Sequence, residues 1–167
     1  MIKIGDSLPE ATLYEFVDVE REGCSLGPNA FSVTEMVKGK KIVIFAVPGA
    51  FTPTCSEQHL PGYVNNAQKF TETGIDEIWC VAVNDAFVMG AWGRAQHVAG
   101  KIRMLADGSG LFTKALGLEM DLTGRGLGVR SQRYAMVVDN GVVKTLNVEA
   151  PGKFEASKAE TILGTLK

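Results

Sequence analysis

Two short apolar runs separated by a helical pattern place the strongest constraint on the fold of this chain. Residues 40–47 read KKIVIFAV and residues 77–83 read EIWCVAV. Continuous apolar runs of this length are typical of strands buried on both faces of a sheet. Apolar residues recur at helical spacing between the runs, at Leu60, Tyr63, Val64, Ala67 and Phe70. A strand, a helix and a strand in this order predict a parallel βαβ unit.

Local signals mark where the predicted helices begin, bend and end. Gly74 is expected to close the first helix and Pro61 to kink it, because proline cannot donate a backbone hydrogen bond. Asp85 is the expected N-cap of a second helix that reaches about Val98. Asn140-Gly141 between apolar runs is the strongest short signal for a hairpin.

The remaining patterns extend the βαβ unit into an α/β fold, a central mixed sheet with helices on both faces. We expect strands at 102–105, 134–139 and 142–148 and helices at 111–118 and 156–166. No internal repeat or linker interrupts the sequence, so residues 1–167 are expected to form one domain.

Composition excludes several function classes. The formal net charge is −2, without a long run of either sign, so we expect no nucleic-acid partner and no anionic membrane surface. The first residues, MIKIGDSLPEA, contain no apolar signal segment, and no run is long enough to span a membrane. Three cysteines are an odd and sparse set, which suits free thiols in the cytoplasm.

Cys55 lies where the predicted fold would place reactive groups. It follows the first strand after the loop PGAFTPT and stands at the start of the helix, at the carboxyl end of a central strand. The positive end of the helix dipole and free backbone N–H groups favour a thiolate, which is the nucleophilic form. A packed structural cysteine remains the alternative from these residues alone.

The neighbours of Cys55 could complete a site. The Thr52 hydroxyl could donate a hydrogen bond to the sulfur or to a substrate oxygen. Pro48 and Pro53 stiffen the loop and could shield the sulfur from water. An arginine from elsewhere in the chain would add a fixed positive charge.

The segment from Pro48 to Cys55, PGAFTPTC, resembles the PxxxTxxC signature of peroxiredoxins. The longer text VPGAFTPTCSEQHLPGY is similar to the type II branch, the atypical "five" class. Three further blocks are similar to the same branch, namely VNDAFVMGAWG, LADGSGLFTKALGL and RSQRYAMVVDNGVV. The resemblance extends over about residues 3–148, which is nearly the whole chain.

The resemblance implies a thioredoxin-like fold and the reduction of hydrogen peroxide and organic hydroperoxides, without a metal or an organic cofactor. It assigns the peroxidatic cysteine to Cys55, with Thr52 and Pro48 as the conserved threonine and loop proline. The family arginine precedes the aromatic residue that opens a late strand, which here is Arg133, with Arg130 as the second choice. It further implies a homodimer.

The resemblance also bears on how an oxidised Cys55 is reduced again. Some type II members carry a second cysteine just before the last helix, whereas residues 147–157 contain none. Cys80 lies within a predicted buried strand, and Cys24 lies in a predicted surface loop, so neither is expected to take part. We therefore expect an external reductant, glutathione or glutaredoxin first and thioredoxin second.

These residues are also compatible with other functions. A disulfide exchanger would require Cys-x-x-Cys, and Cys55-Ser-Glu-Gln supplies one cysteine. A redox sensor on the same thiol remains open. His59 stands one helical turn after Cys55, but a zinc site needs two more ligands, so a structural role is expected. The loop from Gly124 to Gly128 follows no strand and lacks the lysine of a phosphate-binding loop.

Overall fold

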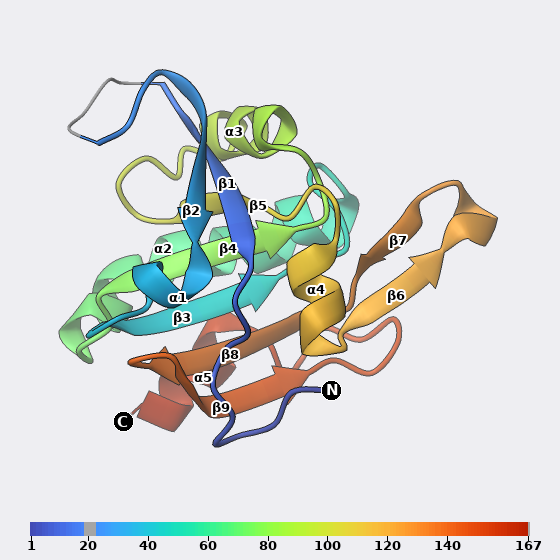
Figure 1. Ribbon diagram of the computed structural model, residues 1–167. Coiled ribbons are helices and arrows are strands. Elements are labelled where there is room, and N and C mark those ends of the chain that lie inside the picture. Colours follow the sequence, from blue (N-terminus) through green and yellow to red (C-terminus); the bar gives the residue numbers. More distant parts are fainter. Residues whose placement is uncertain (19–22, 167) are drawn as a thin grey trace.

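The computed structural model describes residues 1–18 and 23–166, and a mixed sheet forms the centre of this part (Figure 1). The strands lie in the order β2-β1-β5-β4-β3-β8-β9. The parallel centre consists of β3 (Lys41–Ala46), β4 (Glu77–Ala82) and β5 (Arg103–Ala106). β8 (Tyr134–Asp139) and β9 (Val142–Val148) extend it on one side as an antiparallel hairpin. β1 (Thr12–Val17) and β2 (Gly27–Ser32) extend it on the other.

Helices cover both faces of this sheet, as the sequence predicts. α2 (Leu60–Glu72), α3 (Ala86–Ala95) and α5 (Ala159–Leu166) pack on the face that carries Val43 and Phe45. α1 (Val33–Met36) and α4 (Leu111–Leu116) pack on the face that carries Ile42 and Ile44. Successive side chains of a strand point to opposite faces, so a strand covered on both sides reads as a continuous apolar run.

Several predicted boundaries are confirmed. The two central strands, the β8–β9 hairpin and the Asp85 N-cap lie where the sequence places them, and the Asp85 carboxylate accepts a hydrogen bond from Val88 N at 2.8 Å. The hairpin turns through Asn140 and Gly141, both with positive φ. α2 ends at Glu72, two residues before Gly74, whose φ is +93°.

Other boundaries were wrong. α3 ends at Ala95 rather than near Val98, because the chain turns into the left-handed region at His97, whose φ is 56°. α5 begins at Ala159 rather than at residue 156. Pro61 stands at the start of α2, directly after a π-helical turn over Cys55–His59.

Two hairpins lie outside the elements that the sequence predicted. One is formed by β1 and β2. The other is formed by β6 (Glu119–Leu122) and β7 (Gly128–Ser131), which project from the body of the molecule on the right of Figure 1. The short helix η2 (Thr123–Arg125) connects them, so the Gly124–Gly128 loop is a hairpin turn.

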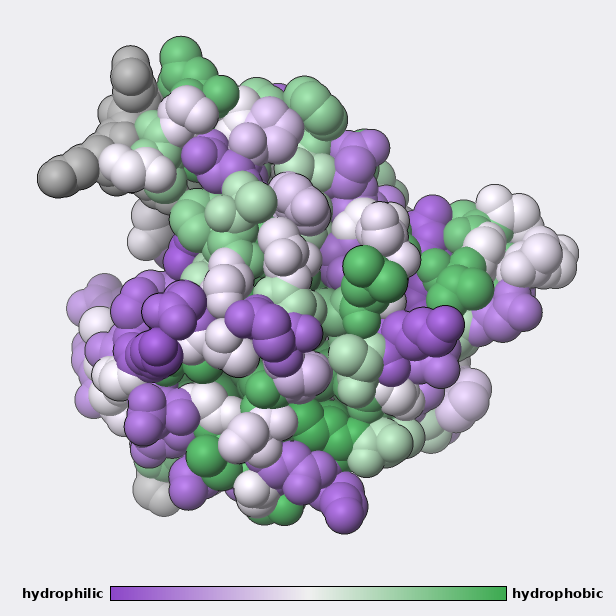
Figure 2. Space-filling view, in the orientation of Figure 1, coloured by the Kyte–Doolittle hydropathy of each residue, from purple (hydrophilic) through white to green (hydrophobic). Residues whose placement is uncertain are grey.

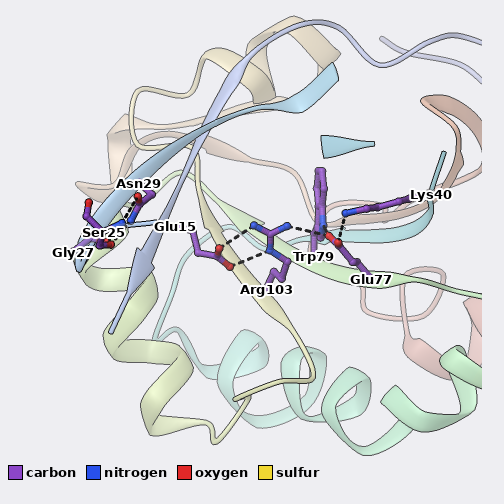
Figure 3. A network of polar contacts seen from close by, with 8 residues as sticks. All are labelled: Glu15, Ser25, Gly27, Asn29, Lys40, Glu77, Trp79 and Arg103. Atoms are coloured by element: carbon purple, nitrogen blue, oxygen red, sulfur yellow. Dashed lines mark hydrogen bonds and ion pairs between the residues drawn. The ribbon is translucent and has the colours of Figure 1, made fainter. Parts of the chain in front are cut away.

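A network of charged side chains joins the strands on one side of the sheet (Figure 3). Arg103 of β5 donates to both carboxylate oxygens of Glu15 at 2.9 and 3.1 Å and to Glu77 of β4 at 3.0 Å. Glu77 also accepts from Lys40 Nζ at 2.6 Å and from Trp79 Nε1 at 2.9 Å. Burial alone would raise the pKa of Glu77, but the donors from Lys40, Trp79 and Arg103 outweigh it and lower that pKa.

We expect Arg103→Met to lower the free energy of unfolding by about 2–4 kcal/mol, because it removes two hydrogen bonds to Glu15 and one of three side-chain donors to Glu77, and both carboxylates are partly buried. Lys38→Met is the matched control. Its partner Glu35 and Lys38 itself are both 68% exposed, so a loss under about 0.5 kcal/mol is expected. Urea denaturation measures both, and equal losses would contradict the role of the network.

The pKa of Glu77 is lower in the folded protein than its ordinary value of 4.5. Ionised Glu77 therefore stabilises the fold at pH values above 4.5, and this stabilisation is lost as the pH falls through the pKa of the folded state.

Candidate active site

Cys55 lies in a widened helical turn at the carboxyl end of β3. Helical backbone begins at Pro53, and residues Cys55–His59 form one π-helical turn, η1, in which Leu60 N bonds to Cys55 O. Single π turns recur at functional sites. The Cys55 side chain is fully buried, with 0% exposure, and it packs with the α2 and α3 side of the core.

Arg133 brings a positive charge to this buried sulfur. Its neighbour Tyr134 opens β8 and pairs with Ala46 of β3, so Arg133 stands beside the carboxyl end of the strand that leads to Cys55. The carbonyl of Arg133 accepts from Glu149 N at 2.9 Å, which fixes its backbone. Arg133 Nη2 donates to Cys55 Sγ at 3.1 Å. Within the described ranges no carboxylate forms an ion pair with Arg133, so its charge serves the sulfur.

His59 is the second partner of Arg133. Arg133 Nη1 lies 2.8 Å from His59 Nδ1, and His59 Nε2 lies 3.1 Å from the Ser157 carbonyl oxygen. A guanidinium can only donate, so Nδ1 accepts and the ring proton is on Nε2, which donates to Ser157. Burial, and then the charge of Arg133, lowers the pKa of His59 to about 3. The imidazole is therefore neutral at physiological pH.

The segment before α5 closes over His59 and is itself fixed by Glu149. The Glu149 carboxylate accepts from the backbone N–H groups of Glu155, Ala156 and Ser157 at 2.8 to 3.1 Å and from the Ser157 hydroxyl at 2.7 Å. Burial would raise the pKa of Glu149, but these four donors lower it. Glu149 thus holds the turn that presents the Ser157 carbonyl to His59.

Phe154, in the same turn, covers the two basic side chains. Its ring lies 5.0 Å from the His59 ring, centroid to centroid, and 5.7 Å from the guanidinium carbon of Arg133. An aromatic face attracts a guanidinium, so this contact adds to the fixation of Arg133.

The loop before Cys55 differs in one contact from the sequence expectation. The Thr52 hydroxyl donates to the Gly49 carbonyl at 2.7 Å. A hydroxyl has one proton, so in this structure Thr52 does not donate to the sulfur, and its oxygen is left as an acceptor. Arg130 Nη1 donates to the Pro48 carbonyl at 3.2 Å, and a Cβ on Gly49 would lie 2.8 Å from that nitrogen. Because Gly49 has no Cβ, the Arg130 side chain can approach the loop this closely.

The structure thus separates the two arginines between which the sequence left a choice. Arg133 contacts the sulfur, whereas Arg130 holds the loop at Pro48. The other cysteines lie apart from this contact. Cys80 is fully buried within β4, and burial raises the pKa of its thiol well above the ordinary value. Cys24 is half-buried in the β1–β2 connection, and all three thiols are free.

Sequence reasoning missed the groups that support Arg133. His59 was expected to be structural, and neither Glu149 nor Ser157 was singled out. The spacing of Cys55 and His59, one helical turn apart, is a signal that could have placed both against one partner. No local pattern marks Glu149 or Ser157, because their role follows from a turn that folds back from the end of β9.

Met89 and Trp92 of α3 belong to the core, and both side chains are fully buried. Trp92 Nε1 donates to the Ser56 hydroxyl at 3.0 Å, which ties α3 to the turn that carries Cys55. His97 is exposed and lies beyond the end of α3. No helix in the described ranges has both the length and the apolar character that a membrane span requires.

A buried sulfur that faces a fixed guanidinium at the start of a helix can act as a nucleophile. The guanidinium and the helix N-terminus both favour negative charge at this point. The same guanidinium could stabilise charge that moves from sulfur to a departing oxygen. These groups together suit a displacement on a small electrophile.

Comparison with known proteins gives a consistent assignment. The Redoxin family model matches residues 3–163. Peroxiredoxin-2C of Oryza sativa subsp. japonica is 46% identical over 165 residues, which cover 99% of this chain and 98% of the relative. Reduced Prx3 of Vibrio vulnificus, solved in complex with hydrogen peroxide, is 59% identical over the full length of both chains, with a TM-score of 0.92. The fold is accordingly the thioredoxin-like fold of these proteins.

One solved structure carries a different description. A chain from Burkholderia cenocepacia, described provisionally as a thioredoxin reductase, is 67% identical, covers 100% of this chain and 99% of its own length, and has a TM-score of 0.99. Cys24, Cys55 and Cys80 include no Cys-x-x-Cys pair, which a dithiol reductase of this fold would use. The likeness therefore supports the fold and not that activity.

Proposed function

This chain belongs to the peroxiredoxin family, in its type II branch, and we propose that it is a thiol-dependent peroxidase whose reacting atom is the sulfur of Cys55. The observation that carries the proposal is the 3.1 Å contact between Arg133 Nη2 and Cys55 Sγ, at the position of the PxxxTxxC motif. The substrates proposed are hydrogen peroxide and organic hydroperoxides.

The proposed reaction is a displacement at a peroxide oxygen. The Cys55 thiolate donates an electron pair to one oxygen, the O–O bond breaks, and the departing hydroxide or alkoxide takes up a proton to leave as water or an alcohol. Negative charge moves from sulfur to the departing oxygen, and the Arg133 guanidinium can follow it. Cys55 is oxidised to a sulfenic acid, which a thiol can reduce again.

Thr52 and Pro48 have distinct roles in this proposal. Thr52 donates its hydroxyl proton to Gly49, so its oxygen is set to accept the O–H of a bound peroxide rather than to donate to it. The Pro48 carbonyl, bonded to Arg130, keeps the loop closed over the sulfur. Because Cys55 is fully buried, groups that cover the sulfur must move before a peroxide can reach the thiolate.

We propose that an external thiol reduces the sulfenic acid, with glutathione or glutaredoxin preferred over thioredoxin. Residues 147–157, where a second cysteine would lie, contain none, and the turn they form is held by Glu149. Cys80 lies inside β4, hydrogen-bonded between two strands, so its exposure would require opening of the sheet.

We expect steady-state peroxide turnover with glutathione, with or without glutaredoxin, to exceed turnover with thioredoxin at least about tenfold, because no second cysteine is placed to form the internal disulfide that thioredoxin reduces. A panel of the three donors with one peroxide measures this. Dithiothreitol is the control, because a small dithiol reports whether the sulfenic acid can be reduced at all. Turnover with thioredoxin alone would contradict the choice of donor, and a single oxidation with no turnover by any donor would favour a redox sensor.

A homodimer and a cytoplasmic location complete the proposal. Phe51, in the loop before Cys55, and Phe87, in the first turn of α3, are 54% and 63% exposed. Apolar surface also gathers over the start of α4 and along the β6–β7 hairpin (Figure 2), where Leu111 and Val129 are 66% and 51% exposed. Large exposed apolar side chains mark contact surfaces, so these residues favour a dimer. A monomer in analytical ultracentrifugation at micromolar concentration would exclude it.

The cytoplasmic location is proposed from the free thiols alone. Two plant relatives are named chloroplastic, so the names of the relatives do not decide it.

A further inference from the structure

Arg133 could point its guanidinium in several directions, and the contacts around it show what fixes one of them. Its long side chain has many rotamers, and within the described ranges it has no carboxylate partner. Two directed hydrogen bonds hold it, one to Cys55 Sγ and one to His59 Nδ1. The bond to sulfur changes when the sulfur is oxidised, so His59 is the partner that stays constant.

His59 is itself held in place on all sides. Its ring lies 5.0 Å from the rings of Phe45 and Phe154 and 5.6 Å from Tyr63. Its Nε2 proton is directed at the Ser157 carbonyl, which also accepts from the Tyr63 hydroxyl at 2.8 Å. Glu149 fixes Ser157 through its backbone N–H and hydroxyl, and its own N–H fixes the Arg133 carbonyl. Both ends of the Arg133–His59 contact are therefore attached to Glu149.

We propose that His59 is a positioning residue, which orients the Arg133 guanidinium on the Cys55 sulfur and is kept in the correct tautomer by the Ser157 carbonyl. The chain of contacts runs from Glu149 through Ser157 and His59 to Arg133 and the sulfur. The inference rests on the proposed function for its catalytic consequence, but the geometry and its first test do not require turnover.

Geometry separates this role from general-base catalysis. A base that takes the thiol proton needs a free lone pair directed at the sulfur. The lone pair of His59 is on Nδ1 and accepts from Arg133, while Nε2 carries a proton and faces Ser157. His59 therefore acts on the sulfur only through Arg133.

The first test uses the unmodified protein. Nitrogen-15 NMR of the histidine side chains should show His59 as the Nε2–H tautomer, with Nδ1 unprotonated across the neutral range. His97, which is exposed, is the internal control for the assignment of the two histidine signals. An Nδ1–H tautomer or a doubly protonated His59 would overturn the proposal, because neither can accept from Arg133.

The second test separates the two nitrogens of His59. In His59→Asn the amide oxygen takes the place of Nδ1 and keeps the acceptor for Arg133. In His59→Gln the amide nitrogen takes the place of Nε2, which keeps the donor to Ser157 but removes the acceptor for Arg133. The His59→Asn variant should keep the rate of peroxide attack within about threefold of wild type. The His59→Gln variant should lower that rate about 10²-fold, since misorientation of a catalytic group costs about that much.

The fraction of Cys55 present as thiolate at neutral pH, from ultraviolet absorbance in a Cys24→Ser background, should fall in the Gln variant and hold in the Asn variant. Phe70→Leu, buried in α2 and stacked on Tyr63, is the matched stability control and should change the melting temperature alone. Equal effects of Asn and Gln, or effects that follow the melting temperature, would overturn the proposal. If the wild-type protein consumed no peroxide while the Asn and Gln variants still differed in thiolate fraction, the proposed function would be contradicted and the positioning role of His59 would stand.

Discussion

Cys55→Ser is expected to reduce peroxide consumption to the background rate, a loss of about 10⁴-fold or more. A serine hydroxyl is not ionised at neutral pH and is a poor nucleophile, even beside Arg133. The substitution is close in size, so the guanidinium and His59 should stay in place and the fold should persist. Peroxide consumption with glutathione present measures the loss, and circular dichroism checks the fold.

Cys80→Ser and Cys24→Ser are the matched controls for this variant. Cys80 is buried in β4 with its pKa raised by burial, and Cys24 lies in the connection between β1 and β2. Both should keep most of the activity, although a hydroxyl buried at position 80 should lower stability. Substantial turnover in Cys55→Ser, or its loss in Cys24→Ser, would end the assignment of the reacting atom.

Arg133→Gln is expected to slow the attack on peroxide about 10²- to 10³-fold, because it removes the charged donor that faces the sulfur and the departing oxygen. Glutamine cannot carry the charge that favours the thiolate, so the thiolate fraction at neutral pH should also fall. Stopped-flow measurement of the second-order rate constant, with peroxide in excess, separates this step from reduction by the donor thiol.

Arg130→Gln is the matched control, three residues away and with a hydrogen bond to the Pro48 carbonyl rather than to the sulfur. A loss of less than about tenfold is expected there, since the loop loses one anchor while the Arg133 guanidinium stays on the sulfur. If both variants lost activity equally, the choice of Arg133 would be wrong. If Arg133→Gln kept its rate, the sulfur would depend on the helix terminus alone.

The sequence predicted the centre of the fold because those residues are buried on both sides. β3, β4 and β8 are apolar runs buried along almost their whole length, and the Asn140-Gly141 turn signal places β9 beside β8. β1 was missed because it is a half-exposed strand, where exposed Thr12 and Tyr14 flank buried Leu13 and the pattern is short. Its pairing with β5 joins Tyr14 to Ala106 and Glu15 to Leu105, which are far apart in the sequence, and is not visible locally.

The site was predictable where a motif carries it and not where the tertiary fold does. Cys55, Thr52 and Pro48 lie within one strand-loop-helix segment, so their proximity follows from the chain. Arg133 could be chosen over Arg130 only through a resemblance, and the register of β8 on β3 supplies the physical reason for that choice. The Glu149 turn depends on three backbone N–H groups, and no side-chain pattern announces them.

The same limit explains the corrected role of Thr52. From sequence, a threonine three residues before a cysteine could donate to it. The structure shows the hydroxyl directed back at Gly49, because the loop folds tightly enough for that carbonyl to lie 2.7 Å away. The direction of a hydroxyl depends on which acceptor the loop presents, and loop conformation is the least predictable part of a chain.

Direct identification of the oxidised atom gives the sharpest test of the account. Wild-type protein is treated with a single equivalent of hydrogen peroxide, trapped with a reagent selective for sulfenic acids, and mapped by peptide mass spectrometry. We expect the adduct on Cys55, with Cys24 and Cys80 unmodified and no disulfide within the chain. An adduct on either other cysteine, or a disulfide between any two of the three, would contradict it.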